Sequence, residues 1–344
     1  MKLAVVVFNL GGPDSLEAVE PFLRNLFCDP AIIALPGLLR IPLARFIARR
    51  RAPIAREIYA RIAGRSPILE ETQAQATALE RALAARGIEA RAFIAMRCWH
   101  PFSDEAAKAV KDWGAQRIVL LPLYPQFSTT TTASSFAEWE RAAARSGLNA
   151  PQRRVCCYPA DEGFIAALAA AVRETWTKAK PGLRYRLLLS AHGLPKRVIA
   201  AGDPYQGQVE RTAAALVERL GMDDPDWTVC YQSRVGPLRW IGPATDDEIR
   251  RAGAEGIGVI VVPIAFVSEH SETLVELDMD YAKLARESGV ADYLRAPTVG
   301  VRGEFIEALR DLVLRAAARD TSASGGAGRI CPATGQCGSR EDWR

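Results

Sequence analysis

The feature that most constrains the fold is the alternation of short apolar runs with longer amphipathic stretches. The run Ile257–Val267 contains no charged residue, as expected for a strand that is covered on both faces of a parallel sheet. Strands of this kind alternating with helices predict a doubly wound α/β architecture. The expected strands are Leu3–Leu10, Ala90–Met96, Arg117–Leu123, Arg153–Tyr158, Tyr185–Leu189, Asp226–Gln232 and Gly258–Phe266. The expected helices are Thr72–Arg86, Ser103–Trp113, Gly163–Lys178, Gln206–Leu220, Thr245–Ala254 and Arg302–Ala318.

The length of 344 residues is enough for two domains of ordinary size, and 49% hydrophobic with 24% charged residues is typical of a globular protein. We expect two similar Rossmann-like halves, 1–165 and 166–320, with a seam near Gly163–Pro181. After Ala318 the sequence TSASGGAG has the composition of a flexible linker, so 321–344 is predicted to be a cysteine-containing tail.

Charge and hydropathy exclude several classes of protein. The formal net charge of +4 is small, and the absence of a basic tract with interleaved aromatic residues argues against nucleic-acid binding. Met1 and Lys2 lead directly into a predicted strand rather than a signal peptide, which predicts a cytoplasmic location. No uninterrupted apolar run reaches the roughly 18 residues of a membrane-spanning helix. The composition leaves the oligomeric state open.

An acidic segment, Ser268–Asp280, directly follows the apolar run that ends at Val267. On an α-helix four of its carboxylates would share a stripe roughly 80° wide, and these are Glu269, Glu272, Glu276 and Asp280. No Lys or Arg lies between Ser268 and Tyr281, so a cationic partner is expected to compensate them. A solvated acidic helix face is the alternative. Because open α/β sheets bind ligands at the carboxyl ends of strands, the position favours a functional site.

Two of the three histidines also lie at the ends of predicted strands. His192 follows the apolar run Leu187–Leu189, His270 lies in the acidic segment, and His100 lies in the first half. A hydrogen-bonded structural histidine is the alternative at each position. Imidazole together with carboxylate suits Fe(II), Zn(II) or Mn(II), and a row of carboxylates can accept protons. The residues therefore suggest metal handling coupled to proton removal.

A glycine pair, Gly11 and Gly12, follows the first predicted strand. A nucleotide site is disfavoured, because the G-x-G-x-x-G pattern is absent and Pro13 has no backbone N–H. Close approach of the backbone to a flat ligand is the favoured interpretation, and a simple tight turn is the alternative.

Several separated motifs resemble those of ferrochelatase, in the same order and over nearly the whole chain. They are NLGGP at Asn9–Pro13, RIAGRSP at Arg61–Pro67, LPLYPQFS at Leu121–Ser128, SAHGLP at Ser190–Pro195, YQSRVGPLRWIGP at Tyr231–Pro243 and PIAFVSEHSETLVELD at Pro263–Asp278. The resemblance implies a lyase that inserts Fe(II) into protoporphyrin IX, the last step of haem biosynthesis, and releases two protons. Coproporphyrin III as the substrate, a cobalt chelatase and a porphyrin carrier are the alternatives.

The resemblance also implies roles for individual residues. His192 looks like the family's active-site histidine, a proton acceptor or metal ligand, and Glu272 looks like its carboxylate partner. Four residues resemble an outer row that carries metal inward or protons outward, namely Glu269, His270, Glu276 and Asp280. Six positions match the porphyrin cleft: Leu10, Arg51, Tyr59, Ser66, Arg97 and Trp240. Each of the six could instead be a core residue or a surface ion pair. Cys98 is a departure, because the family usually has tyrosine after this arginine.

The segment Ala31–Ala48 is apolar but is interrupted by two prolines and two arginines. It resembles the family's hydrophobic lip, which borders the cleft and can rest on a membrane surface, here the inner membrane. The alternative is a core helix with Arg40 and Arg45 extending their charged ends to solvent.

The seven cysteines of a cytoplasmic chain argue against a disulfide framework. Cys28, Cys98 and Cys230 are most simply small buried side chains. A [2Fe-2S] cluster, which some ferrochelatases carry, would need four thiolates, and the candidates are Cys156, Cys157, Cys331 and Cys337. The common animal pattern has three tail cysteines and one just after the YPQ motif, whereas this tail has two and Thr129 occupies the internal position.

Overall fold

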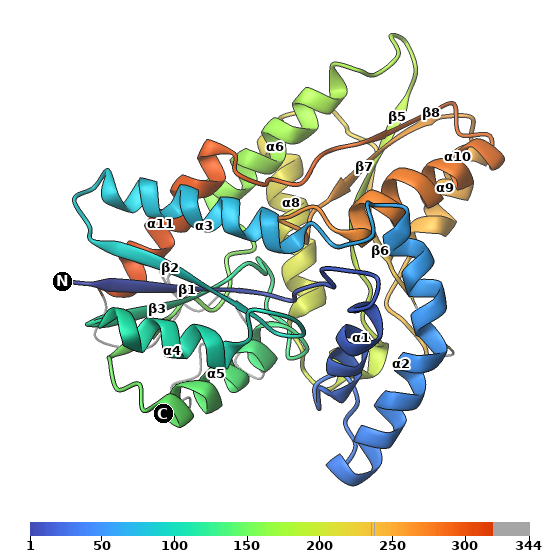
Figure 1. Cartoon of the computed structure of the whole chain (residues 1–344). Coiled ribbons are helices and arrows are strands. Elements are labelled where there is room, and N and C mark those ends of the chain that lie inside the picture. The colour runs from blue at the N-terminus through green and yellow to red at the C-terminus, as the bar shows by residue number, and fades with distance from the viewer. Residues whose placement is uncertain (235, 237, 319–344) are drawn as a thin grey trace. The chain divides into compact units, whose positions relative to one another are not determined.

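The longest apolar runs form the central strands of two parallel four-stranded sheets (Figure 1). The computed structural model describes residues 1–234, 236 and 238–318. One sheet has the order β2-β1-β3-β4, and its strands are β1 (Leu3–Asn9), β2 (Ala90–Met96), β3 (Arg117–Pro122) and β4 (Gln152–Arg154). The other has the order β6-β5-β7-β8, and its strands are β5 (Tyr185–His192), β6 (Trp227–Gln232), β7 (Gly258–Pro263) and β8 (Asp292–Arg295). The predicted architecture of two doubly wound α/β halves is confirmed.

The described residues form two units, each built around one sheet. Unit 1 contains residues 1–157 with 309–318, and unit 2 contains Tyr158–Ala308. The helices of unit 1 are α1 (Val19–Cys28), α2 (Gly37–Ala60), α3 (Ile68–Ala84), α4 (Ser103–Trp113) and α5 (Thr132–Ser146). The helices of unit 2 are α6 (Glu162–Trp176), α7 (Lys196–Ala200), α8 (Tyr205–Leu220), α9 (Thr245–Ala254), η1 (Glu272–Tyr281) and α10 (Ala282–Glu287). The last helix, α11 (Gly303–Ala317), begins in unit 2 and ends in unit 1.

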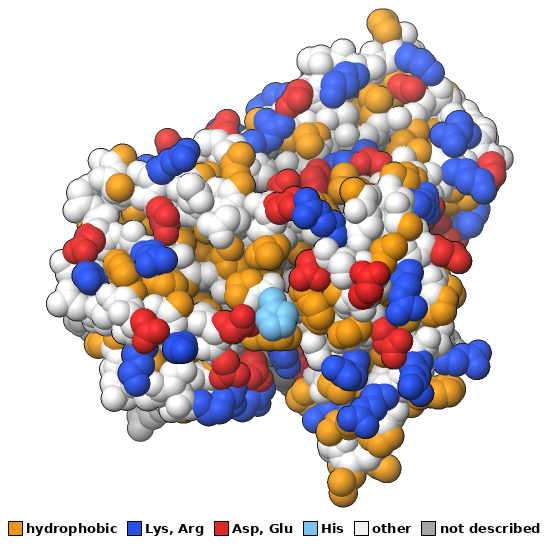
Figure 2. All heavy atoms as spheres, in the orientation of Figure 1, with side chains coloured by type: hydrophobic (Ala, Val, Ile, Leu, Met, Phe, Trp, Pro, Cys, Tyr) orange, Lys and Arg blue, Asp and Glu red, His pale blue; other side chains and the backbone are white. Residues whose placement is uncertain are grey.

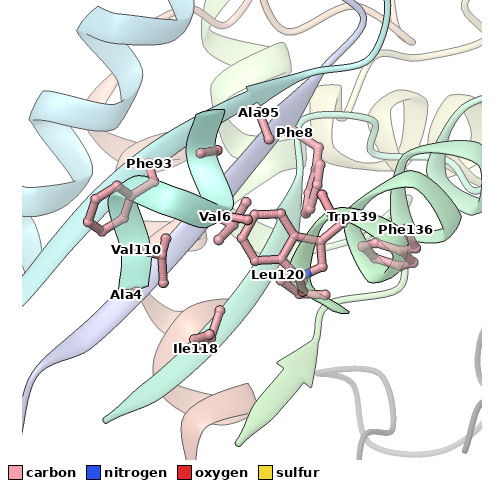
Figure 3. Packing of buried hydrophobic residues seen from close by; sticks show 14 residues of the cluster. Ala4, Val6, Phe8, Phe93, Ala95, Val110, Ile118, Leu120, Phe136 and Trp139 are labelled. Carbon is pink, nitrogen blue, oxygen red and sulfur yellow. The ribbon is translucent and has the colours of Figure 1, made fainter. Parts of the chain in front are cut away.

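Aromatic side chains fill one face of the first sheet (Figure 3). Phe8 of β1 contacts Phe136 and Trp139 of α5 edge to face, with ring centroids 5.6 and 6.0 Å apart. Val110 of α4 lies in the same cluster. On the other face, Ala76 of α3 packs with β2. Helices therefore cover both faces, which explains why every residue of β1 is buried.

The strand order of the second sheet places a topological switch point between β5 and β7. The chain passes from β5 to β6 on one side, and β7 then pairs with the opposite edge of β5. Ligands bind at such switch points in open α/β sheets, at the carboxyl ends of the strands. His192 is the last residue of β5, and the acidic segment follows β7. The fold thus brings His192 and the acidic segment to the edge of the sheet where a ligand is expected to bind.

The acidic segment folds differently from the prediction. From Glu272 to Tyr281 it is a π-helix, in which backbone N–H groups bond five residues back instead of four. The expectation of one α-helical stripe that includes Glu269 is therefore wrong, because Glu269 precedes the helix. The wider turn of the π-helix aligns residues about four apart, so Glu272 and Glu276 share one side.

Among the described residues, no helix combines the length and the hydropathy that crossing a bilayer would require.

Candidate active site

The centre of the candidate site is a pair formed by His192 and Glu272. His192 Nδ1 lies 2.8 Å from Glu272 Oε2, although the two residues are 80 positions apart in sequence. The side chains are 37% and 28% exposed, so both remain accessible to a substrate. Because a carboxylate accepts hydrogen bonds, Nδ1 carries the proton and the lone pair of Nε2 is left for a proton or a metal ion.

A second histidine, His270, also lies near the carboxylate of Glu272. Its Nδ1 lies 3.0 Å from the backbone carbonyl oxygen of Ser268, which can only accept, so His270 carries its proton on Nδ1. The Nε2 atom is then an acceptor, and it lies 4.0 Å from Glu272 Oε2. An imidazole nitrogen and a carboxylate oxygen are both ligands that a divalent metal ion accepts.

Electrostatics couple the protonation of His192 to the charge of Glu272. Burial opposes protonation of the His192 imidazole, but the negative charge of Glu272 and its hydrogen bond outweigh burial and raise the pKa of His192. For Glu272, burial alone would raise the pKa, and the charge and hydrogen bond of His192 lower it instead. Glu276 differs, because burial and the neighbouring charge of Glu272 raise its pKa. The two carboxylates of one helix therefore have opposite tendencies to hold a proton.

Gln232, the last residue of β6, and Ser233, which follows it, were not among the predicted site residues and hold Glu276 in place. The backbone N–H of Ser233 donates to Glu276 Oε1 at 2.9 Å, and its hydroxyl contacts Oε2 at 2.5 Å. Gln232 donates from Nε2 to Glu276 Oε2 at 3.0 Å and to the carbonyl oxygen of Glu272 at 3.1 Å. Tyr281 donates to Glu276 Oε1 at 3.1 Å. A signal was present in the sequence, because Gln232 and Ser233 also stand at the carboxyl end of a predicted strand.

Arg295 is the cationic partner that was expected for the acidic segment, and it pairs with two of the segment's carboxylates. Arg295 of β8 donates to Glu269 Oε1 at 2.6 Å and to Asp278 Oδ1 at 2.7 Å. The backbone N–H of Thr298 also donates to Glu269 Oε1, at 3.0 Å. Glu269 and Asp278 thus form a paired structural group, separate from Glu272 and Glu276. Asp280 lies exposed near the end of the π-helix.

Loss of Arg295 should destabilise the fold. Arg295→Met leaves two partly buried carboxylates without their counter-charge, so we expect the free energy of unfolding to fall by about 3 kcal/mol. Urea unfolding followed by circular dichroism measures the change. The matched control is Arg250→Met, because Arg250 also contacts two carboxylates but is 52% exposed, and its loss should cost about 0.5 kcal/mol. Equal effects of the two substitutions would show that the buried pair is not a stabilising feature.

Five of the six predicted porphyrin contacts belong to unit 1. Leu10 and Tyr59 lie in one apolar cluster, which also contains the buried Cys98. The backbone N–H groups of Arg97 and Cys98 donate to the carbonyl oxygens of Asn9 and Leu10, which brings Arg97 beside Leu10. The Arg51 guanidinium lies 5.9 Å from the ring centroid of Phe27, a partly buried member of the same cluster. These predicted contacts therefore gather at the carboxyl ends of β1 and β2.

Arg97 is held by a buried acid. Its Nη2 atom lies 2.9 Å from Asp29 Oδ2, and its Nε donates to Ser134 Oγ at 2.7 Å. Asp29 is only 3% exposed, so Arg97 is bound in a buried ion pair. The geometry gives Arg97 a structural role in addition to any contact with a ligand.

The glycine pair after β1 serves close packing within unit 1. A Cβ atom on Gly12 would lie 2.5 Å from both Cβ and Oγ of Ser66, which excludes a larger residue. Gly11 has a φ of +84°, and a Cβ there would meet Met96 and Trp99. Ser66 is itself buried, and its backbone N–H donates to the carbonyl oxygen of Pro13 at 2.8 Å. Within unit 1, the group that lies closely against the backbone of Gly12 is thus the side chain of Ser66.

Trp240, the sixth predicted contact, lies in unit 2 near His192. It bridges to Pro195, and a Cβ atom on Gly193 would come within 3.4 Å of the indole ring. The indole Nε1 is buried and finds no hydrogen-bond partner among the described residues. The indole therefore presses against the turn that follows His192.

The described cysteines are buried except for Cys28, which is partly exposed. Burial raises the pKa of Cys98 and of Cys230 to about 12, so neither thiol ionises at neutral pH. Cys156 and Cys157 pack with Phe127 and are 1% and 4% exposed. The other two predicted cluster ligands, Cys331 and Cys337, lie outside the described residues. Among the residues that the structure describes, no three His, Cys, Asp or Glu side chains converge on one metal position.

Known proteins resemble this chain in sequence and in fold. Residues 2–317 match the family model described as Ferrochelatase. The chain is 57% identical to a ferrochelatase of Phenylobacterium zucineum, over 99% of this chain and 98% of that protein. It is 57% identical to a ferrochelatase of Caulobacter vibrioides, over 94% of each chain. Among solved structures it resembles SirB from Bacillus subtilis with Fe3+, with a TM-score of 0.53 and 16% identity over 92% of this chain and 96% of that one. The last comparison supports the fold alone.

Proposed function

The chain belongs to the ferrochelatase family, and on that premise we propose that His192 and Glu272 form the centre of its reaction. The reaction is the insertion of Fe(II) into protoporphyrin IX, which yields protohaem, the final product of haem biosynthesis, and releases two protons. The observation that supports this centre is the 2.8 Å contact between His192 Nδ1 and Glu272 Oε2 at the switch point of the second sheet.

Insertion requires groups that remove protons from the macrocycle while iron enters it. The neutral His192 imidazole offers its Nε2 lone pair to a pyrrole proton or to Fe(II), and Glu272 stabilises the imidazolium that forms. His192 and Glu272 offer one imidazole and one carboxylate to the metal, and the four porphyrin nitrogens supply the rest of its coordination. The π-helix then offers Glu276 and Asp280 as the next carboxylates along the same helix, with His270 beside Glu272. Part of the free energy of porphyrin binding can be used to bend the porphyrin ring, which exposes its nitrogen lone pairs to the metal.

The choice of porphyrin is tested by comparing substrates. Purified protein is supplied under anaerobic conditions with Fe(II) and either protoporphyrin IX or coproporphyrin III, and kcat/KM is measured for each. We expect a preference of about tenfold or more for protoporphyrin IX, equivalent to about 1.4 kcal/mol. A preference for coproporphyrin III would transfer the assignment to that substrate, and insertion into neither would remove the proposed function.

Contact with a membrane surface is proposed for α2. Only small or aromatic positions of this helix are buried, whereas Leu38, Leu39 and Phe46 are 91%, 62% and 60% exposed. These exposed apolar side chains favour a surface contact over the core-helix alternative. In Figure 2 apolar and basic side chains gather on the part of unit 1 where α2 begins, at the bottom of the view. Apolar side chains interleaved with arginines suit a surface of anionic lipid, as expected for a protein that rests on the inner membrane.

Binding to vesicles tests this contact. The triple variant Leu38→Ser, Leu39→Ser, Phe46→Ser should bind vesicles of anionic phospholipid at least about tenfold more weakly in a sedimentation assay. Each substitution removes apolar area that the lipid surface would otherwise bury. Val301→Ser is the matched control, because Val301 is 52% exposed and lies in unit 2. Unchanged binding by the triple variant would exclude α2 as the contact.

A [2Fe-2S] cluster held by Cys156, Cys157, Cys331 and Cys337 is also proposed. The iron atoms of such a cluster need thiolate ligands, and Cys156 and Cys157 supply two neighbouring buried sulfur atoms, which fits this donor chemistry. The purified protein should contain two non-haem iron atoms per cluster and absorb visible light. Cys156→Ser should lose both properties, and Cys98→Ala should keep them. Wild-type protein without non-haem iron would contradict the cluster.

A further inference from the structure

Gln232 is bonded to the backbone on both sides of the proposed centre. It is the register partner of His192 in the parallel pairing of β5 with β6, and its carbonyl oxygen accepts the N–H of Gly193 at 2.9 Å. Its side chain donates from Nε2 to the backbone carbonyl oxygen of Glu272 at 3.1 Å. Glu272 is the first residue of the π-helix η1. Gln232 therefore joins the strand end that carries His192 to the helix that carries Glu272.

Two buried hydroxyl groups hold the other end of the Gln232 side chain. Ser190 donates from Oγ to Gln232 Oε1 at 2.8 Å, and the same Oγ lies 3.0 Å from Thr245 Oγ1. Because an amide oxygen only accepts, the single O–H of Ser190 points at Gln232, and Thr245 is the donor to Ser190. Ser190 and Thr245 are 0% exposed and Gln232 is 1% exposed. The three side chains thus form an ordered, buried series of hydrogen bonds.

The Gln232 amide has only one orientation that satisfies its surroundings. Its nitrogen carries two N–H groups, and these meet two acceptors, the carbonyl oxygen of Glu272 and the Oε2 atom of Glu276 at 3.0 Å. Its oxygen meets the hydroxyl of Ser190. Rotation of the amide would leave buried donors and acceptors without partners, which is costly. The amide therefore fixes the position of the first turn of η1 relative to β5.

We infer that Gln232, held by Ser190 and Thr245, is a positioning residue that sets the distance between the side chains of His192 and Glu272. The inference rests on the proposed function, because the 2.8 Å contact of these two side chains is the proposed centre of the reaction. The two residues are 80 positions apart, so their contact depends on how the strand and the helix are held together. A displacement of about 1 Å at a reacting group can slow a reaction about 10²-fold.

Four substitutions separate this role from a purely structural one. Gln232→Met keeps an unbranched buried side chain of similar size but removes the amide. Ser190→Ala is milder, because it removes only the donor to Gln232 Oε1. Thr245→Ser is the conservative variant, because it keeps the hydroxyl that donates to Ser190. Gln208→Met is the matched control, because Gln208 is a buried glutamine of the same unit, 2% exposed and on α8.

The first measurement is anaerobic insertion of Fe(II) into protoporphyrin IX, with kcat, both KM values and thermal unfolding recorded for each variant. We expect Gln232→Met to lower kcat about 10- to 100-fold, with KM values within about twofold of wild type. Ser190→Ala should lower kcat about three- to tenfold, and Thr245→Ser should stay within about twofold of wild type. Gln208→Met should unfold at a lower temperature, as Gln232→Met does, but keep the wild-type kcat. Equal kcat values for the two glutamine variants would overturn the inference.

Crystal structures of the wild type and of Gln232→Met, both without substrates, give a second readout that does not depend on catalysis. In the wild type His192 Nδ1 should lie 2.8 Å from Glu272 Oε2. In the variant the distance should exceed about 3.5 Å, beyond the range of a hydrogen bond. An unchanged distance in the variant would overturn the inference and leave the proposed function intact. A longer distance in the variant, together with a wild type that forms no haem, would support the positioning role and overturn the proposed function.

Discussion

Replacing His192 with alanine is expected to slow insertion of Fe(II) into protoporphyrin IX by about 10²- to 10⁴-fold, the range that a lost general base produces. The substitution removes the only imidazole that contacts Glu272 at hydrogen-bond distance among the described residues. It should leave the fold intact, because the ring is 37% exposed and ends a strand whose other residues make the core. The rate is measured as haem formed under anaerobic conditions.

His100→Ala is the matched control for this prediction. His100 also contacts a carboxylate, with Nδ1 2.8 Å from Glu105 Oε2, but it is 55% exposed and lies in unit 1. Its loss should change the rate by less than about twofold, as expected for a residue that touches no reacting group. If His192→Ala inserted iron as fast as His100→Ala, His192 would be neither base nor metal ligand.

Replacing Glu272 with glutamine is expected to lower the insertion rate by about 10²-fold or more, because the side chain keeps its shape and loses its charge. A second effect follows from the electrostatics. The charge of Glu272 raises the pKa of His192 against the opposing effect of burial, so its removal should lower that pKa. NMR titration of the His192 ring in the enzyme without substrates measures the shift directly.

Glu287→Gln controls for the loss of one carboxylate. Glu287 lies on α10 of the same unit, is 62% exposed and contacts Lys283 at 3.8 Å. Neither the rate nor the His192 pKa should change in this variant. A Glu272→Gln enzyme with normal turnover would remove Glu272 from the site, and an unchanged His192 pKa would show that the two side chains are not coupled in solution.

The parts of the fold that depend on local hydrophobicity could be predicted from the sequence. β1, β5 and β7 are buried along almost their whole length, so their residues form apolar runs that stand out. β8 was not predicted, because Asp292–Arg295 is only partly buried and includes two charged residues. α2 was also not predicted as a helix of its full length, because Pro42 and Pro53 lie inside it.

The site could be predicted only as far as strand ends and residue types allow. The positions of His192 and Glu272 follow from the switch point and from the rule that parallel strands present their carboxyl ends together. The π-helix could not be predicted, because helices of this type are rare and a spacing of four between carboxylates also fits an α-helix. Recognition of Arg295 as the partner of Glu269 and Asp278 required β8, which the sequence did not reveal.

The central claim is that this chain inserts Fe(II) into protoporphyrin IX at His192 and Glu272. Its most direct test mixes the purified protein anaerobically with Fe(II) and protoporphyrin IX, and records protohaem by absorbance and protons by a pH indicator. The account predicts protohaem in step with porphyrin consumed and two protons released per haem, with both signals abolished together in His192→Ala. Porphyrin that binds the protein but remains free of metal would contradict it.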